Sequence, residues 1–256
     1  MPEPFPAPEK RLRICALYPE LMNIYADRGN LLLLERRCAW RGIGCEITPS
    51  SLGAALDPDA HDLFYIGGGQ DRDQRLCAAD LVERKADALR AAAARGALIL
   101  GVCGGYQLLG NSYVLDGEEI AGVALLDIET VREDAPRLIG NVAIDVASWI
   151  ADSAAGGDGV LAGFENHGGR TRLGARQEPL GRVLRGYGND GHSGFEGARS
   201  GNTFGTYLHG PLLPKNVWFA DWLIARALGD EPSQLEPLDD ALEAQAHSDA
   251  RRAAGV

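Results

Sequence analysis

Cys103 lies in a sequence that is typical of a nucleophilic cysteine. In LGVCGGYQLLG (100–110) an apolar run passes directly into a cysteine flanked by glycines, and a segment with helical character follows. This is the layout of a nucleophile elbow with cysteine in place of serine, and the glycines leave room for its sharp, strained turn. The start of the next helix favours thiolate over thiol, and the N–H of Gly104 would point to a developing oxyanion. The pattern therefore predicts a nucleophile rather than a core cysteine.

A cysteine nucleophile needs a general base, and histidine is the residue that most often supplies one. His209 ends a strand-like run at 203–208 and precedes Gly210 and Pro211, which stop the strand. Because active sites lie at the carboxyl ends of parallel strands, we expect His209 to be the base. His167, in the loop sequence FENHGGR, stays open as the alternative. The other three histidines lie at less favourable places: His61, His192 and His247.

A triple glycine follows the apolar run 62–66. Gly67, Gly68 and Gly69 are followed by Gln70, and at the carboxyl end of a strand such a turn lets backbone N–H groups approach a ligand closely. This loop could supply the second oxyanion donor, and a flexible turn is the alternative. Neither a phosphate-loop sequence nor a dinucleotide fingerprint is present, so no cofactor is expected on this chain.

Positioning these residues requires a parallel α/β sheet. Four short apolar runs have the length of buried strands: 12–18, 43–48, 62–66 and 97–102. Helical segments are predicted at 30–40, 80–95 and 217–228. Strands that alternate with helices form parallel sheets, and fully apolar strands are covered on both faces. We therefore expect a three-layer α/β fold with a mostly parallel central sheet. Between 122 and 205 shorter β-type runs and glycine-rich turns predict an antiparallel extension.

The composition excludes several classes of protein. Of 256 residues 36 are acidic and 25 basic, which gives a formal net charge of -11 and argues against binding to nucleic acid or an anionic membrane. The five cysteines are odd in number and form no CxxC pair, and the proline-rich start is unlike a signal peptide. We expect a cytoplasmic protein with free thiols and no metal site. Its single domain spans 12–228, between a disordered tail at 1–11 and an acidic, alanine-rich tail at 229–256 that is helical or disordered.

The elbow resembles that of the triad (class I) glutamine amidotransferase family. Gly101, Cys103, Gly105 and Gln107 are in register with the family pattern G-x-C-x-G-x-Q. Most members carry a glutamate two residues after the catalytic histidine, and this chain has Pro211 there. The cobyric acid synthase-like branch of the family shares that departure.

Five further stretches are similar to one group within this branch, the glutaminase subunits of lipid II isoglutaminyl synthases. They occur in the same order: NIYADRGN (23–30), YIGGGQDRDQ (65–74), RLIGN (137–141), GFENHGGRT (163–171) and GTYLHGPLLPKN (205–216). Cobalamin-pathway amidotransferases carry a fused synthetase domain upstream, whereas only about ten residues precede the first predicted strand here. We therefore expect a free-standing glutaminase with a separate synthetase partner.

The resemblance implies a thioester mechanism. Cys103 attacks the side-chain amide of L-glutamine, and the N–H groups of Gly104 and of Gly68 and Gly69 hold the oxyanion. His209 protonates the leaving ammonia and then activates the water that hydrolyses the thioester.

The resemblance also implies how substrate is bound and where ammonia goes. Arg137 grips the α-carboxylate of glutamine, and Gln107 is a second substrate-binding residue. Ammonia passes to a Mur-ligase-like, MurT-type partner in a heterodimer. That partner uses ATP to activate the D-glutamate α-carboxylate of lipid II, which is amidated to D-isoglutamine. The partner would also contribute an acidic residue that orients His209, in place of the glutamate that Pro211 replaces.

Three other functions stay open at this point. The chain could supply ammonia to another acceptor such as a corrinoid. It could be a catalytically silent, metabolite-binding subunit, because the usual third triad residue is missing. It could also be a stand-alone thiol hydrolase.

Overall fold

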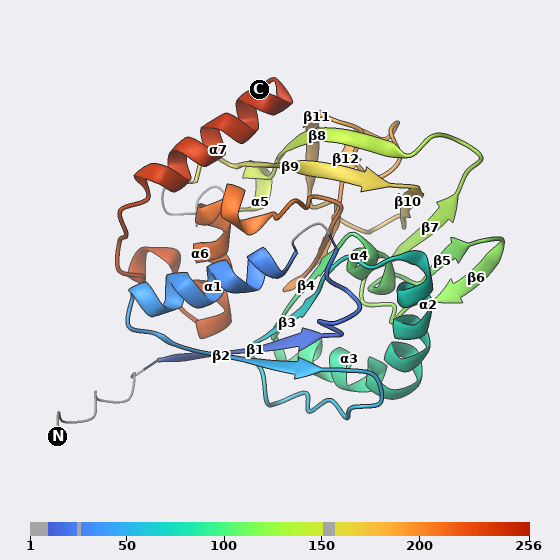
Figure 1. Ribbon diagram of the computed structural model, residues 1–256, viewed down its shortest axis with the longest axis horizontal. Coiled ribbons are helices and arrows are strands. Elements are labelled where there is room, and N and C mark those ends of the chain that lie inside the picture. The colour runs from blue at the N-terminus through green and yellow to red at the C-terminus, as the bar shows by residue number, and fades with distance from the viewer. Residues whose placement is uncertain (1–9, 25–26, 151–156) are drawn as a thin grey trace.

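The fold is built on a six-stranded sheet that carries Cys103 at the end of a central strand. The computed structural model describes residues 10–24, 27–150 and 157–256. The order in the sheet is β13 (Ala198–Ser200), β14 (Thr203–Thr206), β4 (Leu98–Val102), β3 (Leu63–Ile66), β1 (Arg11–Leu17) and β2 (Gly44–Ser50). All neighbours are parallel except β13 and β14, which pair antiparallel. The prediction of a mostly parallel α/β sheet is therefore confirmed (Figure 1).

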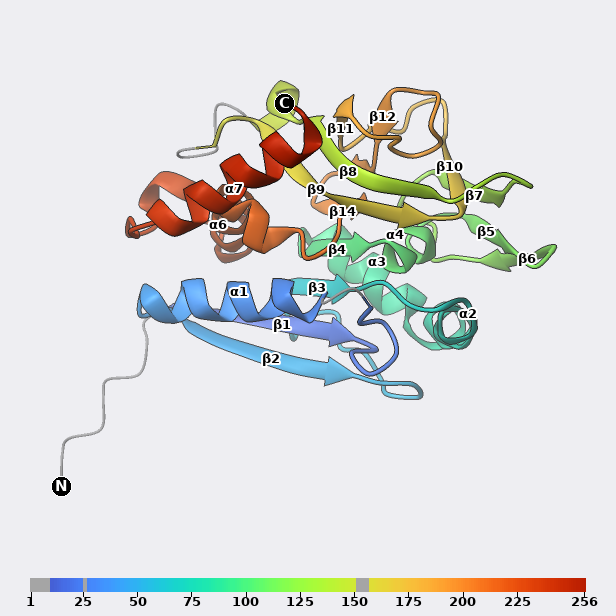
Figure 2. The same ribbon diagram turned by 45° about the horizontal axis from the view of Figure 1, so that its top comes forward.

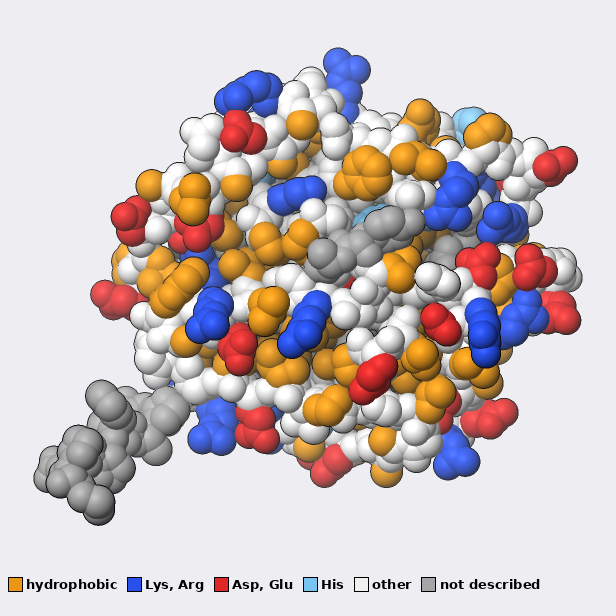
Figure 3. Space-filling model, in the orientation of Figure 1, with side chains coloured by type: hydrophobic (Ala, Val, Ile, Leu, Met, Phe, Trp, Pro, Cys, Tyr) orange, Lys and Arg blue, Asp and Glu red, His pale blue; other side chains and the backbone are white. Residues whose placement is uncertain are grey.

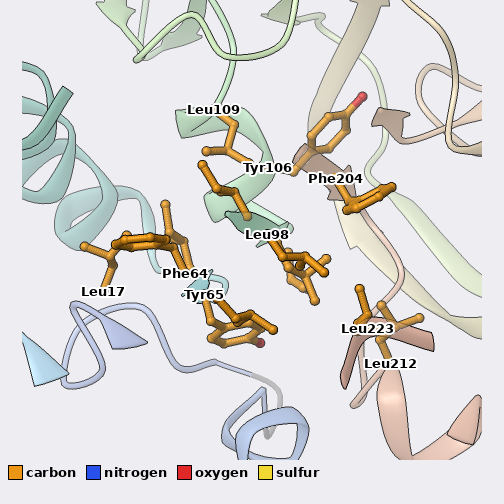
Figure 4. Close-up of a cluster of buried hydrophobic side chains, with 14 of the residues drawn as sticks. Leu17, Phe64, Tyr65, Leu98, Tyr106, Leu109, Phe204, Leu212 and Leu223 are labelled. Atoms are coloured by element: carbon orange, nitrogen blue, oxygen red, sulfur yellow. The ribbon is translucent and has the colours of Figure 1, made fainter. Parts of the chain in front are cut away.

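Three of the four inner strands are buried along their whole length, which explains their apolar sequences. Every residue of β3, β4 and β14 is buried. Helices α1 (Arg28–Trp40) and α6 (Val217–Leu228) pack against each other, and α6 contacts β1 and β4. The short helix α4 (Gly104–Leu108) packs on β4 and β14. Figure 4 shows Phe64, Leu98 and Phe204 of the strands in one buried cluster with side chains of α4 and α6.

The helix expected at 80–95 begins earlier than predicted. Helix α2 (Asp71–Asp80) continues through a π-helical turn (Leu81–Lys85) into α3 (Ala86–Arg95). Asp80 is therefore not an N-cap but an interior residue. Its carboxylate accepts hydrogen bonds from the hydroxyl of Tyr18 at 2.8 Å and the N–H of Gly53 at 2.7 Å, and it pairs with the buried ammonium of Lys85. Gly96 ends the helix in the left-handed conformation, as its sequence position predicts.

The antiparallel part forms two smaller sheets. One has the order β10 (Gly169–Leu173), β7 (Ile128–Arg132), β5 (Ser112–Leu115) and β6 (Glu118–Ala121). The other has the order β12 (Phe195–Glu196), β11 (Gly181–Arg185), β8 (Leu138–Asp145) and β9 (Val160–His167). An isolated antiparallel bridge between Phe164 in β9 and His209 joins the second small sheet to the segment that follows β14. The remaining short elements are α5 (Ala147–Ile150) and a 3-10 turn, η2 (Leu213–Lys215).

At both ends of the chain, secondary structure extends into the segments predicted as tails. Strand β1 begins at Arg11, inside the predicted tail 1–11, and residues 1–9 of that tail lie outside the described residues. After Gly229 the chain forms a 3-10 turn, η3 (Pro232–Gln234), and a helix, α7 (Ala241–Ala254), that packs on β8 and β9 (Figure 2). Among the described residues, no helix combines the length and hydropathy that a membrane span requires. Figure 3 shows acidic and basic side chains interspersed on one face of the molecule.

Candidate functional site

Cys103 occupies a strained turn between β4 and α4. Its φ of 54° and ψ of -108° lie outside the ordinary regions for a residue with a side chain, and its N–H donates to the carbonyl of Thr206 at 2.8 Å. The flanking glycines are required by space. A Cβ on Gly101 would lie 2.8 Å from the backbone of Gly105, and a Cβ on Gly105 would overlap the carbonyl oxygen of Ile66. The predicted elbow geometry is therefore present.

The thiol of Cys103 is protonated at rest. The side chain is 8% exposed, and burial, with a smaller contribution from the Asp27 carboxylate, raises its pKa to about 12. The N–H of Gly104 and the guanidinium of Arg137 act in the opposite direction and lower the same pKa. The helix-start stabilisation expected from the sequence thus exists but is outweighed by burial, because α4 is only one turn long. Attack by sulfur needs a base that removes the proton.

His209 leaves the strand next to the one that carries Cys103. Thr206 of β14 pairs with Val102 of β4, so both residues follow the carboxyl ends of neighbouring parallel strands. The imidazole is fully buried, and its backbone pairs with Phe164 at 3.0 and 3.1 Å. Burial lowers the pKa of His209 to about 4, with further lowering by the charges of His167, Lys215 and Arg137. His209 is therefore neutral at pH 7, the state that a base requires.

His167, the alternative base, lies on the wall of the pocket that contains Cys103. Its ring stacks on Tyr207 with centroids 3.6 Å apart and planes inclined by 2°. Nδ1 lies 2.8 Å from the carbonyl of Gly169 and thus donates to it, while Nε2 lies 3.8 Å from the carboxylate of Glu165. His209 is not among the residues that line this pocket. The structure thus brings both histidines to the same end of the sheet and fixes both rings by packing.

Arg137 also lines this pocket and presents a free positive charge. It precedes β8, and its guanidinium donates to the side-chain and backbone oxygens of Asn166 at 2.9 and 2.7 Å. No carboxylate of the described residues forms an ion pair with it. Asn166 holds the guanidinium in place and its positive charge is not neutralised by an ion pair within the described residues, so it suits a carboxylate ligand.

Gln107 lies on the pocket wall with both ends of its amide engaged. Its oxygen accepts from the amide of Gln74 at 2.6 Å, and its nitrogen donates to the hydroxyl of Tyr207 at 3.0 Å. The Tyr207 hydroxyl also lies 2.6 Å from that of Thr171. Gln107 therefore ties α4 to α2 and to the chain after β14. Gln74 and Tyr207 were not singled out from the sequence, because these hydrogen bonds join residues that are far apart in the chain.

The glycine loop lies directly against the elbow. The carbonyl of Gly67 accepts the N–H of Gly105 at 3.0 Å, and a Cβ on Gly104 would lie 3.1 Å from the nitrogen of Gly69. The N–H of Gly68, however, donates to the carboxylate of Asp27 at 2.8 Å. Of the three predicted oxyanion donors, Gly69 and Gly104 are therefore adjacent to each other, whereas the Gly68 donor is already occupied.

Asp27 is a residue of this site that the sequence did not indicate as such. The stretch 23–30 carried part of the family resemblance but no assigned role. A larger and mostly apolar hollow of about 370 Å³ lies beside the same stretch, between β1, β2 and α1, and its lining does not include Cys103.

Comparison with known proteins agrees with this geometry. The sequence profile of the CobB/CobQ-like glutamine amidotransferase domain matches residues 13–217. The chain is 37% identical over 238 residues to the lipid II isoglutaminyl synthase subunit GatD of Staphylococcus aureus, covering 92% of this chain and 93% of that protein. It is 35% identical over 248 residues to the GatD subunit of Streptococcus pneumoniae, covering 94% and 92%. It is 32% identical to the cobyric acid synthase of Xanthobacter autotrophicus, covering 90% of this chain but only 43% of that protein.

Solved structures with a similar fold are more distant in sequence. A chain of PurLQS from Thermotoga maritima superimposes with a TM-score of 0.57 at 20% identity, covering 93% of this chain and 98% of that one. The glutaminase domain of CTPS from Trypanosoma brucei, solved with acivicin, gives a TM-score of 0.50 at 13% identity, covering 86% and 95%. These two matches establish the fold alone. The domain match over residues 13–217 and the relatives at 35–37% identity show that the chain belongs to the CobB/CobQ-like glutamine amidotransferases.

Proposed function

We propose that this chain is the glutaminase subunit of a lipid II isoglutaminyl synthase. The observation that carries the proposal is the strained, glycine-flanked Cys103 in a pocket that also holds the uncompensated charge of Arg137. A nucleophile and a carboxylate-binding cation in one narrow pocket suit an amino acid whose other end carries a reactive amide, as glutamine does.

In the proposed reaction each of these residues has one task. The sulfur of Cys103 attacks the amide carbon of glutamine while His209 takes the thiol proton. The N–H groups of Gly69 and Gly104 stabilise the oxyanion, and Arg137 binds the α-carboxylate. Collapse of the intermediate breaks the C–N bond, and the imidazolium returns its proton to the leaving ammonia. Water then hydrolyses the thioester and restores the thiol, with glutamate as product.

The resting pKa values favour a low activity of the isolated subunit. A thiol with a pKa of about 12 transfers its proton to an imidazole with a pKa of about 4 only at a large energetic cost. A carboxylate brought close to His209 would stabilise the imidazolium. Lys215, which contributes to the lowered pKa of His209, forms no ion pair within the part of the chain that the structure describes, so an incoming carboxylate would also find a cation there. We infer that the separate Mur-ligase-like, MurT-type partner supplies this carboxylate.

The choice of acceptor is supported by the extent of the similarity. The GatD subunits match over more than nine tenths of their length, whereas the cobyric acid synthase cited above matches over less than half of its own. We therefore favour lipid II over a corrinoid. The partner would activate the D-glutamate α-carboxylate with ATP, and ammonia from this chain would convert it to D-isoglutamine on the cytoplasmic side of the membrane.

The test uses the wild-type chain and Cys103→Ala, each with and without the partner. Ammonia release from glutamine should require Cys103 and should rise when the partner is present. Glutamine labelled at its amide nitrogen should transfer the label to lipid II in the complete reaction with ATP. Equal background release in all four samples would reject the glutaminase assignment. Labelling of a corrinoid carboxylate but not of lipid II would reject the acceptor alone.

A further inference from the structure

Two residues that precede α1, Ile24 and Asp27, hold the glycine loop of the site. Asp27 is fully buried at the N-cap position of α1, yet its side chain makes no capping hydrogen bond to that helix. Its Oδ2 instead accepts the N–H of Gly68 at 2.8 Å. The N–H of Ile24 donates to the carbonyl of the same glycine at 3.1 Å. Both polar groups of Gly68 are thus bound by one short segment.

The opposite side of the loop is bound by the elbow. The carbonyl of Gly67 accepts the N–H of Gly105, the second residue of α4. The peptide unit between Gly67 and Gly68 is therefore held at both ends, its carbonyl by α4 and its N–H by Asp27. Such a unit cannot rotate without losing one of two buried hydrogen bonds.

This arrangement sets the direction of the next N–H. In a trans peptide the C=O and N–H groups point to opposite sides, and the carbonyl of Gly68 points to Ile24. The N–H of Gly69 must then point away from Ile24. The nitrogen of Gly69 lies beside Gly104, whose own N–H bonds to the sulfur of Cys103. The loop thus turns one N–H toward Asp27 and the following N–H to the side away from Ile24, and the nitrogen of that second N–H lies beside the elbow.

We propose that Asp27 is a positioning residue for the oxyanion hole, acting through Gly68 to aim the N–H of Gly69 at the reacting carbonyl. This role rests on the proposed glutaminase reaction and assigns a task to the 23–30 stretch. Asp27 touches the loop and not the substrate, so it is not itself a catalytic residue.

Asp27 has a second effect that opposes the first. Its negative charge raises the pKa of the Cys103 thiol, which disfavours the thiolate and the oxyanion alike. Within the described residues its Oδ1 accepts no hydrogen bond, and burial raises the pKa of Asp27 itself to about 6. Geometry and charge can be separated by mutation, because asparagine keeps an oxygen acceptor for Gly68 and removes the charge.

The experiment compares Asp27→Ala and Asp27→Asn with the wild-type chain in the complex with its partner. Steady-state ammonia release gives kcat and KM for glutamine, and the alkylation of Cys103 by iodoacetamide is followed on its peptide by mass spectrometry. Loss of one oxyanion donor lowers kcat on the order of 100-fold, so Asp27→Ala should lose about this much with KM within about twofold. Its Cys103 should be alkylated at least as fast as in the wild type, because the opposing charge is gone.

Asp27→Asn should retain kcat within about tenfold of the wild type, because the acceptor for Gly68 remains. Asp87→Asn, the same change at an exposed position of α3, is the matched control and should leave both rates unchanged.

Three results would overturn the inference. If Asp27→Ala had the kcat of the wild type, the glycine loop would not need the hydrogen bond to Asp27. If its kcat were higher, Asp27 would lower the catalytic rate instead of supporting it. A parallel loss of turnover and Cys103 alkylation would indicate a collapsed pocket instead of a misdirected N–H. Absence of turnover in the wild-type complex would instead reject the glutaminase assignment, and this role with it.

Discussion

Cys103 and His209 follow the ends of neighbouring parallel strands, and both side chains are uncharged at rest. Burial raises the pKa of the thiol and lowers the pKa of the imidazole, so each shift favours the neutral form of its group. The left-handed backbone of Cys103 stores strain of about 1–3 kcal/mol, which the packing of Gly101 and Gly105 against their neighbours maintains. A thiol and an imidazole with these shifts react readily only when a further charge stabilises the imidazolium, which is the role proposed above for a carboxylate of the partner.

The two histidines should differ in their importance for catalysis. We expect His209→Ala to lower glutaminase turnover by at least about 100-fold, because it removes the group that we propose moves protons to and from sulfur. His167→Ala should keep measurable activity, because its ring is stacked on Tyr207 and bound to Gly169 as part of the pocket wall. Ammonia release by each variant in the complex measures this. The opposite ranking would transfer the role of base to His167, which lines the Cys103 pocket.

At the scale of elements, the parts of the site that depend on local sequence are the parts that the sequence predicts. The elbow follows from an apolar strand, a cysteine and the glycines on either side of it, and the unbroken apolar runs of β3 and β4 predict that these strands are buried. The start of α2 was missed because its buried side includes the polar Gln74, which interrupts the apolar stripe of an ordinary amphipathic helix.

Contacts between residues that are far apart in the sequence could not be predicted from local sequence patterns. Asp27 meets Gly68 across 41 positions, and Gln74 meets Gln107 across 33. Sequence shows only that these residues are polar, and polar residues are usually exposed. Their burial and their partners depend on the tertiary fold. The same limit explains why the N–H of Gly68 was expected in the oxyanion hole, although Asp27 accepts it.

The close packing of α4 on β3 gives a prediction about the elbow as a unit. Gly105→Ala would drive a Cβ into the carbonyl oxygen of Ile66, and backbone atoms on both sides leave little room to relax. We expect a loss of about 2–3 kcal/mol in the free energy of unfolding, measured by urea denaturation. Gly140→Ala is the control, because its Cβ in β8 would meet its nearest neighbour only at 3.9 Å. Equal stability of the two variants would mean that α4 shifts easily and that the elbow is not fixed by this contact.

Ion pairs connect the C-terminal tail to the whole molecule. The buried Arg37 of α1 binds Asp221 of α6 at 2.5 Å and Asp240, just before α7, at 2.7 Å. His247 of α7 binds Asp158 at 3.2 Å. No residue of α7 is buried, so the sequence could not distinguish a helix from a disordered tail. The residues that pair with this part of the chain are distant in sequence, and Arg37 and Asp240 are 203 positions apart.

A buried carboxylate that joins two sheets should make global stability depend on pH. Glu196 of β12 is fully buried and accepts hydrogen bonds from the N–H of Tyr207 at 2.6 Å and the hydroxyl of Thr206 at 3.0 Å. Burial, with a contribution from the nearby Glu165 carboxylate, raises the pKa of Glu196 to about 8 in the folded protein, against 4.5 for an ordinary glutamate. Between these two values the folded state binds a proton that the unfolded state has lost. The contribution of Glu196 to the free energy of unfolding is therefore complete below pH 4.5 and falls by about 1.4 kcal/mol per pH unit until about pH 8.

Glu196→Gln mimics the protonated acid and should remove this slope. Urea denaturation at a series of pH values between about 5 and 9 would measure the free energy of unfolding of both proteins. The linkage predicts that the free energy of unfolding of the variant increases relative to that of the wild type as pH rises. The difference between them should level off above about pH 8, where both folded and unfolded Glu196 are ionised. In the difference between the two free energies of unfolding, the contributions of groups that titrate alike in both proteins cancel. Parallel curves would mean that Glu196 is ionised in the folded protein at neutral pH, and that the carboxylate itself receives the N–H of Tyr207 and the hydroxyl of Thr206 where the two sheets meet.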